Sequence, residues 1–159
     1  MEPMIEQMQR EESTLLARAI RIAAEAHETQ VDKAGAPYIL HPLRLMMKAR
    51  TPGERLVAVL HDVVEDSPIT LDSLRGEGFP EEVVAAVDAL THREGEPYED
   101  AIERAAADPL ATAVKFYDLE DNMMLTRLMT LTDKDLERVQ RYHRAHQRLM
   151  EARAQRGGA

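Results

Sequence analysis

The chain has 159 residues, 44% of them hydrophobic and 31% charged, which fits one domain with an ordinary core. Its net charge of −9 opposes non-specific binding to nucleic-acid phosphates, and the absence of cysteine excludes disulfides and thiolate chemistry. No run approaches the roughly 20 apolar residues of a membrane helix, and the first residues do not resemble a signal peptide, so we expect a cytoplasmic protein.

Helix-start signals occur along the whole chain. Thr51-Pro52 with Glu54 is a capping box, Asp108-Pro109 repeats the pattern of a cap followed by proline, and Thr70 and Thr132 are good N-caps. No stretch has the alternation of a strand. We therefore predict an all-α fold, a single domain over residues 1–159 with residues 1–12 and 154–159 frayed. The predicted helices are eight, near 13–29, 42–50, 52–66, 71–77, 80–91, 97–107, 109–128 and 133–153.

The helix predicted at 52–66 carries four polar side chains at its end. His61, Asp62, Glu65 and Asp66 are spaced so that an uninterrupted helix would stack them in one sector. Carboxylates packed so closely repel one another, and a cation between them would remove that cost. The alternative is an ordinary solvated face, since a His-Asp dipeptide also arises by chance.

A third candidate ligand, His41, precedes Pro42 at the expected start of a helix. Its neighbours Tyr38, Leu40 and Leu43 are residues that we expect to be buried. A histidine in apolar surroundings is either a hydrogen-bonded core or capping residue, or a metal ligand.

Asp118 lies inside the apolar run of the helix predicted at 109–128, so we expect it to point inward. A buried carboxylate needs a partner, either a core lysine or arginine or a metal ion. Asn122 is four residues further on the same face, whereas we expect Glu120 and Asp121 to face water.

Together, His41, His61, Asp62 and Asp118 form a set of two imidazoles and two carboxylates. Mixed nitrogen and hard oxygen ligands suit Mn²⁺ or Fe²⁺, with Zn²⁺ and Mg²⁺ as alternatives. Glu65 and Asp66 would lie just beyond such an ion, where they would orient or deprotonate a bound water.

Three segments carry a family resemblance, "AHETQVDKAGAPYILHP", "LHDVVEDS" and "VKFYDLEDNMM". In this order they resemble the HD-domain phosphohydrolases, and most of all the hydrolase domain of RelA/SpoT-type enzymes and their small stand-alone relatives. The resemblance spans about residues 14–130. It implies an all-α HD-domain bundle and a hydrolase, usually Mn²⁺-dependent, that removes pyrophosphate from the 3′ position of the alarmone (p)ppGpp.

The resemblance also assigns roles to individual residues. It implies that the metal ligands are His41, His61, Asp62 and Asp118. It implies that the catalytic pair acting on water is Glu65 and Asp66. It places four further residues at the substrate, namely Lys33, Tyr38, Lys115 and Asn122.

The chain departs from the family pattern at two places. Asp32 stands where the family has an arginine that packs against the purine base, and an acid cannot stack in that way and would repel phosphates. Tyr117, Glu120 and Asp121 replace smaller or more basic residues around Asp118. Both departures make the surroundings of the site less cationic.

Three functions remain open from the sequence. The first is a metal-dependent phosphohydrolase of an alarmone or another nucleotide. The second is a binding module that retains a metal and a nucleotide without turnover, and the third is a helical interaction protein without a metal. A group of methionines, including Met46, Met47, Met124 and Met129, serves either as core filler or as a surface for a homo-oligomer.

Overall fold

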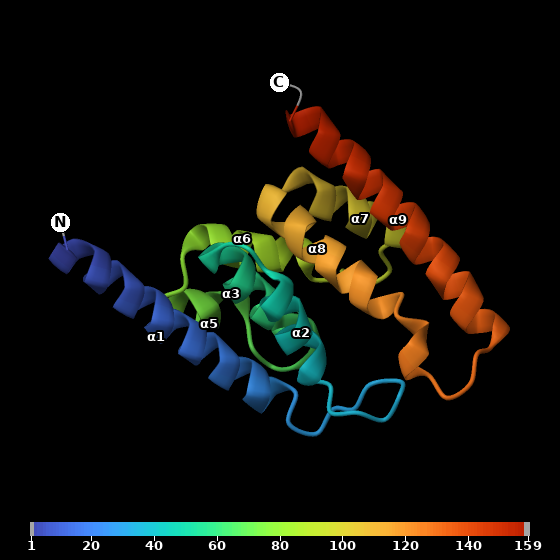
Figure 1. Ribbon diagram of the computed structural model, residues 1–159, viewed down its shortest axis with the longest axis horizontal. Coiled ribbons are helices and arrows are strands. Elements are labelled where there is room, and N and C mark those ends of the chain that lie inside the picture. The colour runs from blue at the N-terminus through green and yellow to red at the C-terminus, as the bar shows by residue number, and fades with distance from the viewer. Residues whose placement is uncertain (1, 158–159) are drawn as a thin grey trace.

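A computed structural model describes residues 2–157 of the chain as a bundle of helices (Figure 1). Within this part of the chain there are nine α-helices, one short 3₁₀ helix and no strand, so the all-α prediction is confirmed. The elements are α1 (Glu2–Ala26), α2 (Leu40–Lys48), α3 (Pro52–Leu60), α4 (Val63–Asp66), α5 (Leu71–Gly76), α6 (Glu81–Leu90), α7 (Tyr98–Ala107), α8 (Pro109–Asn122), η1 (Leu125–Arg127) and α9 (Asp133–Gly157).

The predicted N-caps form because short polar side chains satisfy free N–H groups in the first turn. Thr51 accepts a hydrogen bond from the Glu54 N–H at the start of α3, and Thr70 forms a reciprocal capping box with Ser73 at the start of α5. Asp108 caps α8 in the same way by accepting from the Ala111 N–H. The positions where these helices begin therefore follow from local sequence.

Two clusters of buried apolar side chains make up the core. The larger one joins helices α1 to α6 and the first half of α8, and the smaller one joins α7, α9 and the second half of α8. Figure 1 shows α1 and α9 on opposite flanks with α8 between them and near the centre. Val114 belongs to the larger cluster and Phe116 to the smaller, so α8 is the helix that both clusters share.

The prediction of one helix over 52–66 is wrong. Helix α3 ends at Leu60, His61 and Asp62 form a turn, and α4 begins at Val63. Asp62 adopts φ −107° and ψ −3°, at the edge of the right-handed helical region and near the sparsely populated bridge region. Leu60 and Val63 are both fully buried, so burial on either side of the turn fixes the break.

Other helix boundaries also differ from the prediction, mainly at the ends of the chain. Helix α1 includes residues 2–12 and α9 includes residues 154–157, all of which we expected to be frayed. On α1, Gln7 donates to Glu11 at 3.0 Å and Arg10 pairs with Glu6, contacts between side chains one turn apart that favour helix without burial. Residues 1, 158 and 159 lie outside the described range. Helix α8 ends at Asn122 rather than near residue 128, and η1 follows it.

Among residues 2–157, no helix combines the length and apolar composition needed to cross a bilayer.

We expect Leu45→Ala to lower the free energy of unfolding by about 2–5 kcal/mol, because it removes a large buried side chain and leaves a cavity. Leu45 is fully buried on α2, the helix that carries His41. Met47→Ala is the matched control on the same helix, where 80% of the residue is exposed, and it should change stability by no more than about 0.5 kcal/mol. Chemical denaturation measures both, and equal effects would contradict this description of the core.

Candidate active site

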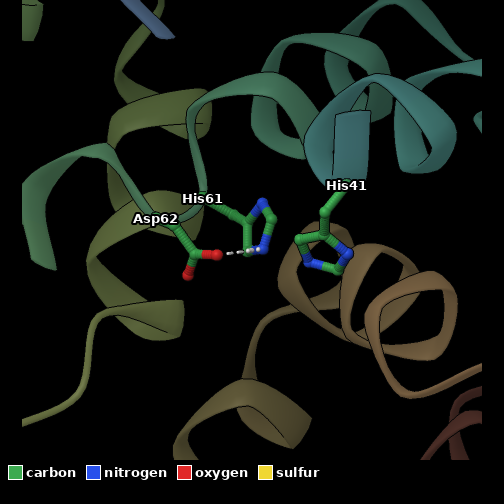
Figure 2. A group of neighbouring side chains, drawn as sticks. All are labelled: His41, His61 and Asp62. Atoms are coloured by element: carbon green, nitrogen blue, oxygen red, sulfur yellow. Dashed lines mark ion pairs between the residues drawn. The ribbon is translucent and has the colours of Figure 1, made fainter. Parts of the chain in front are cut away.

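Side chains from separate elements converge where α2, the α3–α4 turn and α8 meet. His41 is in the first turn of α2, His61 and Asp62 form the α3–α4 turn, and Asp118 is on α8. Figure 2 shows His41, His61 and Asp62 turned toward one another. One ligand atom from each of these three lies within 4.8 Å of the others, a separation that a single metal ion can bridge.

Asp118 completes the group from the opposite side. Its Oδ1 lies 3.1 Å from His41 Nε2 and 3.9 Å from His61 Nε2. His61 Nε2 is also 2.9 Å from Asp62 Oδ2. The structure therefore brings together all four residues that the sequence suggested as metal ligands.

The hydrogen bonds on the far side of each imidazole fix which ring nitrogen faces the cluster. His61 Nδ1 lies 2.7 Å from the carbonyl oxygen of Ala58, so it must carry a proton and donate it. His41 Nδ1 lies 2.7 Å from Asp121 Oδ2 and donates in the same way. In both neutral rings the lone pair is then on Nε2, the atom that faces the carboxylates.

A divalent cation fits this arrangement on two grounds. His61 Nε2 is buried and has no hydrogen-bond partner among the described atoms, although it faces a carboxylate. Two imidazole nitrogens and two carboxylate oxygens are also a donor set typical of first-row divalent ions. Without an ion, two lone pairs would face two negative groups at close range unless the rings were protonated.

The pKa values of the cluster also indicate that its carboxylates require a positive partner. Burial disfavours a charged imidazole, but hydrogen bonds to Asp118 and Asp121 outweigh it and raise the pKa of His41 to about 9. Burial alone would raise the pKa of Asp62, but the facing His61 lowers it to about 2. A proton on His41 thus supplies part of the positive charge that an ion would otherwise bring.

The prediction that Asp121 faces water is wrong, and the sequence pattern did not place it at the candidate site. Its side chain is 1% exposed, and it accepts from His41 and from Arg44, whose Nε and Nη2 lie 2.8 and 2.9 Å from its two oxygens. One signal could have revealed it, since Asp121 is three residues after Asp118 and so shares its inward face. An aspartate in this position orients the imidazole of a metal-binding histidine.

The predicted catalytic pair lies on α4, and its two members have different partners. Glu65 Oε1 accepts from the backbone N–H of His92 at 2.7 Å, which connects it to the segment after α6. Asp66 Oδ2 accepts from Gln30 at 3.1 Å, which connects it to the turn after α1. Although α3 ends at Leu60, the Asp66 N–H still donates to the Asp62 carbonyl oxygen at 3.0 Å, so Asp62 and Asp66 remain one helical turn apart.

The four predicted substrate residues surround the cluster. Tyr38 donates to Asp62, and Asn122 donates to Asp118 Oδ1 at 2.8 Å. Lys115 Nζ lies 2.6 Å from Asp118 Oδ2, so the alternative of a salt bridge with a core cation is also realised at Asp118. Lys33 is exposed on the turn between α1 and α2.

A cavity opens on each side of the cluster. The first has a volume of about 310 Å³, and Lys33, Tyr38, His41 and Asn122 are among its lining residues. The second has a volume of about 200 Å³. Its polar lining includes His61, Asp62, Glu65, Lys115 and Asp118. The candidate metal ligands thus form the wall between two spaces, the larger of which has the size of a small-molecule site.

Curated relatives match this chain over most of its length. A probable GTP pyrophosphokinase of Mycobacterium leprae is 33% identical over 129 residues, which is 73% of this chain and 16% of the relative. A guanosine-3′,5′-bis(diphosphate) 3′-pyrophosphohydrolase of Aquifex aeolicus is 33% identical over 120 residues, 68% of this chain and 17% of the relative. A bifunctional (p)ppGpp synthase/hydrolase SpoT of Escherichia coli is 32% identical over 122 residues, again 68% and 17%. No family model matches the chain.

The predicted resemblance to the RelA/SpoT-type hydrolase domain is confirmed. The chain spans about a sixth of the length of these curated relatives. A solved structure described as a metazoan ortholog of SpoT that hydrolyses ppGpp has the same fold, with a TM-score of 0.68. It is 21% identical, and the match covers 90% of this chain and 96% of that one.

We expect Asp121→Asn to weaken Mn²⁺ binding about 10- to 100-fold, because the uncharged amide no longer holds the N–H of His41 as a carboxylate does. The measurement is calorimetric titration of chelator-treated protein. Glu120→Gln is the matched control, since Glu120 is the adjacent acid but its side chain is 49% exposed and points away to Lys48. Equal affinities for the Asp121 variant and the unchanged protein would contradict a positioning role for Asp121.

Proposed function

We propose that this chain is a metal-dependent hydrolase of the HD superfamily that removes pyrophosphate from guanosine-3′,5′-bis(diphosphate). The observation that carries the proposal is the convergence of two imidazole Nε2 atoms on Asp62 and Asp118 between two cavities. The names of the curated relatives support the choice of substrate, since several are named as 3′-pyrophosphohydrolases of this nucleotide.

The metal would be held by His41, His61, Asp62 and Asp118, with Mn²⁺ as the first candidate and Fe²⁺, Zn²⁺ or Mg²⁺ as alternatives. When bound, such an ion neutralises charge on a phosphoryl group and lowers the pKa of a coordinated water. Asp121 and the Ala58 carbonyl keep the two imidazoles in the tautomer that this requires.

The reaction adds water across the bond between the 3′ oxygen and phosphorus, which yields GDP and free pyrophosphate. We assign removal of the proton from the attacking water to the acids of α4, with Glu65 as the first candidate because it lines the smaller cavity beside His61 and Asp62, and Asp66 as the second. Glu65 and Lys115 both line the smaller cavity. Lys115 can contact an anionic substrate group there while it remains paired with Asp118.

We assign the nucleoside end of the substrate to the larger cavity and the 3′-pyrophosphate to the ion and the smaller cavity. Asn122 and Lys33 line the larger cavity together with Tyr38. Asn122 offers an amide to the ribose while it also donates to Asp118, so it connects substrate position with the metal ligands.

The direct test incubates Mn²⁺-loaded protein with ppGpp and measures GDP and pyrophosphate in equal amounts. We expect His61→Ala to abolish turnover, since it removes a ligand, while His143→Ala, an exposed histidine on α9, retains it. A panel of other nucleotides runs in parallel. Turnover of another nucleotide but not of ppGpp would reject the substrate, and tight nucleotide binding without any turnover would favour a binding module.

A pH series tests the metal site separately from catalysis. Because the pKa of His41 is raised to about 9 in the metal-free protein, that imidazole is protonated at neutral pH and must lose its proton to bind an ion. The apparent affinity for Mn²⁺ should therefore rise between pH 6.5 and 8.5, with proton release. Calorimetry in two buffers of different ionisation enthalpy measures this release, and an affinity that does not depend on pH would contradict it.

A further inference from the structure

The larger cavity is bordered by an arginine that the sequence analysis did not single out. Arg127, at the end of η1, lines this cavity together with Asp32 and Arg44. Its apolar lining comes from the same loop and from two other segments, with Leu125 and Leu128 beside the arginine and Val31 and Val139 elsewhere. Arg127 is therefore a cationic side chain in a mixed cavity whose walls are partly apolar.

Asp32 holds this arginine in place. Its Oδ2 lies 3.7 Å from Arg127 Nη1, while its Oδ1 accepts from the backbone N–H groups of Ala34 and Ala36 at 2.8 and 2.9 Å. The turn after α1 thus fixes the carboxylate, which cannot swing away. Because the carboxylate of Asp32 is paired with the guanidinium of Arg127, Asp32 lines the cavity as part of an ion pair and not as an isolated negative charge.

The other side of the guanidinium is held by α8. Arg127 Nη2 donates to the Asp121 carbonyl oxygen at 2.6 Å and lies 3.5 Å from the Asp121 carboxylate. Two arginines, Arg44 and Arg127, therefore balance two aspartates, Asp32 and Asp121, in one network. The charge of Arg127 is therefore compensated and its Nη2 is hydrogen-bonded, while its Nε is buried without a hydrogen-bond partner among the described atoms.

A guanidinium whose charge is already compensated by two aspartates is better suited to stacking than to binding phosphate. A phosphate would have to compete with the Asp121 carbonyl for Nη2 and with the charge of Asp32 near Nη1, and Nε is buried. Stacking needs only the planar face of the guanidinium, and the side chain is 30% exposed. The apolar neighbours Leu125 and Leu128 also favour a base over a phosphate.

We propose that the purine base of the substrate stacks on the Arg127 guanidinium, and that Asp32 keeps this guanidinium in position. This inference rests on the proposed function, in that the ligand is a purine nucleotide. It assigns base selectivity to the loop between α8 and α9 and gives the aspartate at position 32 a supporting role. Arg127 thereby selects purine over pyrimidine nucleotides.

Two variants separate stacking from charge. Arg127→Lys keeps the positive charge but loses the planar group, and Arg127→Ala loses both. The ligands are GDP, UDP and inorganic pyrophosphate, titrated calorimetrically into the Mn²⁺-loaded full chain. Arg144→Lys, an exposed arginine on α9, is the matched control, and a thermal melt of each variant verifies folding.

We expect both Arg127 variants to lose about 5- to 100-fold in GDP affinity, less in UDP affinity and nothing in pyrophosphate affinity. With ppGpp as substrate, KM should rise by a similar factor while kcat changes less than twofold. Asp32→Asn, which keeps the turn acceptor but removes the charge, should weaken GDP binding severalfold.

Several results would overturn the inference. Near-normal GDP binding by Arg127→Lys with loss in Arg127→Ala would indicate a charge contact to phosphate, and tighter binding by Asp32→Asn would mean that Asp32 repels the ligand. No GDP binding by the unchanged protein would also overturn it. GDP binding with the expected pattern but no hydrolysis of ppGpp would reject the proposed function and leave the role of Arg127 established.

Discussion

The arrangement of the site depends on one buried carboxylate. Asp121 accepts from His41, Arg44 and Arg127, so a single side chain on α8 contacts groups from α2 and from the loop before α9. A buried carboxylate without partners would cost several kcal/mol, and these partners remove that cost only in one relative placement of the elements. The position of the His41 ring and the shape of the larger cavity are therefore set by the same group.

Much of the fold could be predicted from the sequence because the relevant signals are local. Thr51, Thr70 and Asp108 start their helices through contacts within four residues, so the pattern alone was enough. The break at Asp62 was missed because it depends on burial of Leu60 and Val63 against distant helices. The helical spacing of apolar residues continues through Asp62, so the sequence pattern cannot reveal the break.

The candidate site was predictable to a similar degree. The pattern of His41, His61, Asp62 and Asp118 identified side chains that the structure brings together from positions up to 77 residues apart (118 minus 41). Asp121 was not identified, and Arg44 could be either a cleft cation or a surface charge, because each is an ordinary charged residue by itself. Only their contact across helices makes them part of the site. Asp32 was interpreted as a replacement for the family's arginine that cannot stack and would repel phosphates, whereas its partner Arg127 is 95 residues away (127 minus 32).

The pair of Asp32 and Arg127 has a consequence for the width of the larger cavity. It joins the turn after α1 to the loop after α8, two segments that carry few buried apolar side chains. Their separation is held by opposite charges at 3.7 Å with side chains only 14% and 30% exposed, a pair that solvent ions screen less than a surface pair. The spacing at the mouth of the cavity thus depends on one ion pair, whereas the core behind it depends on apolar packing.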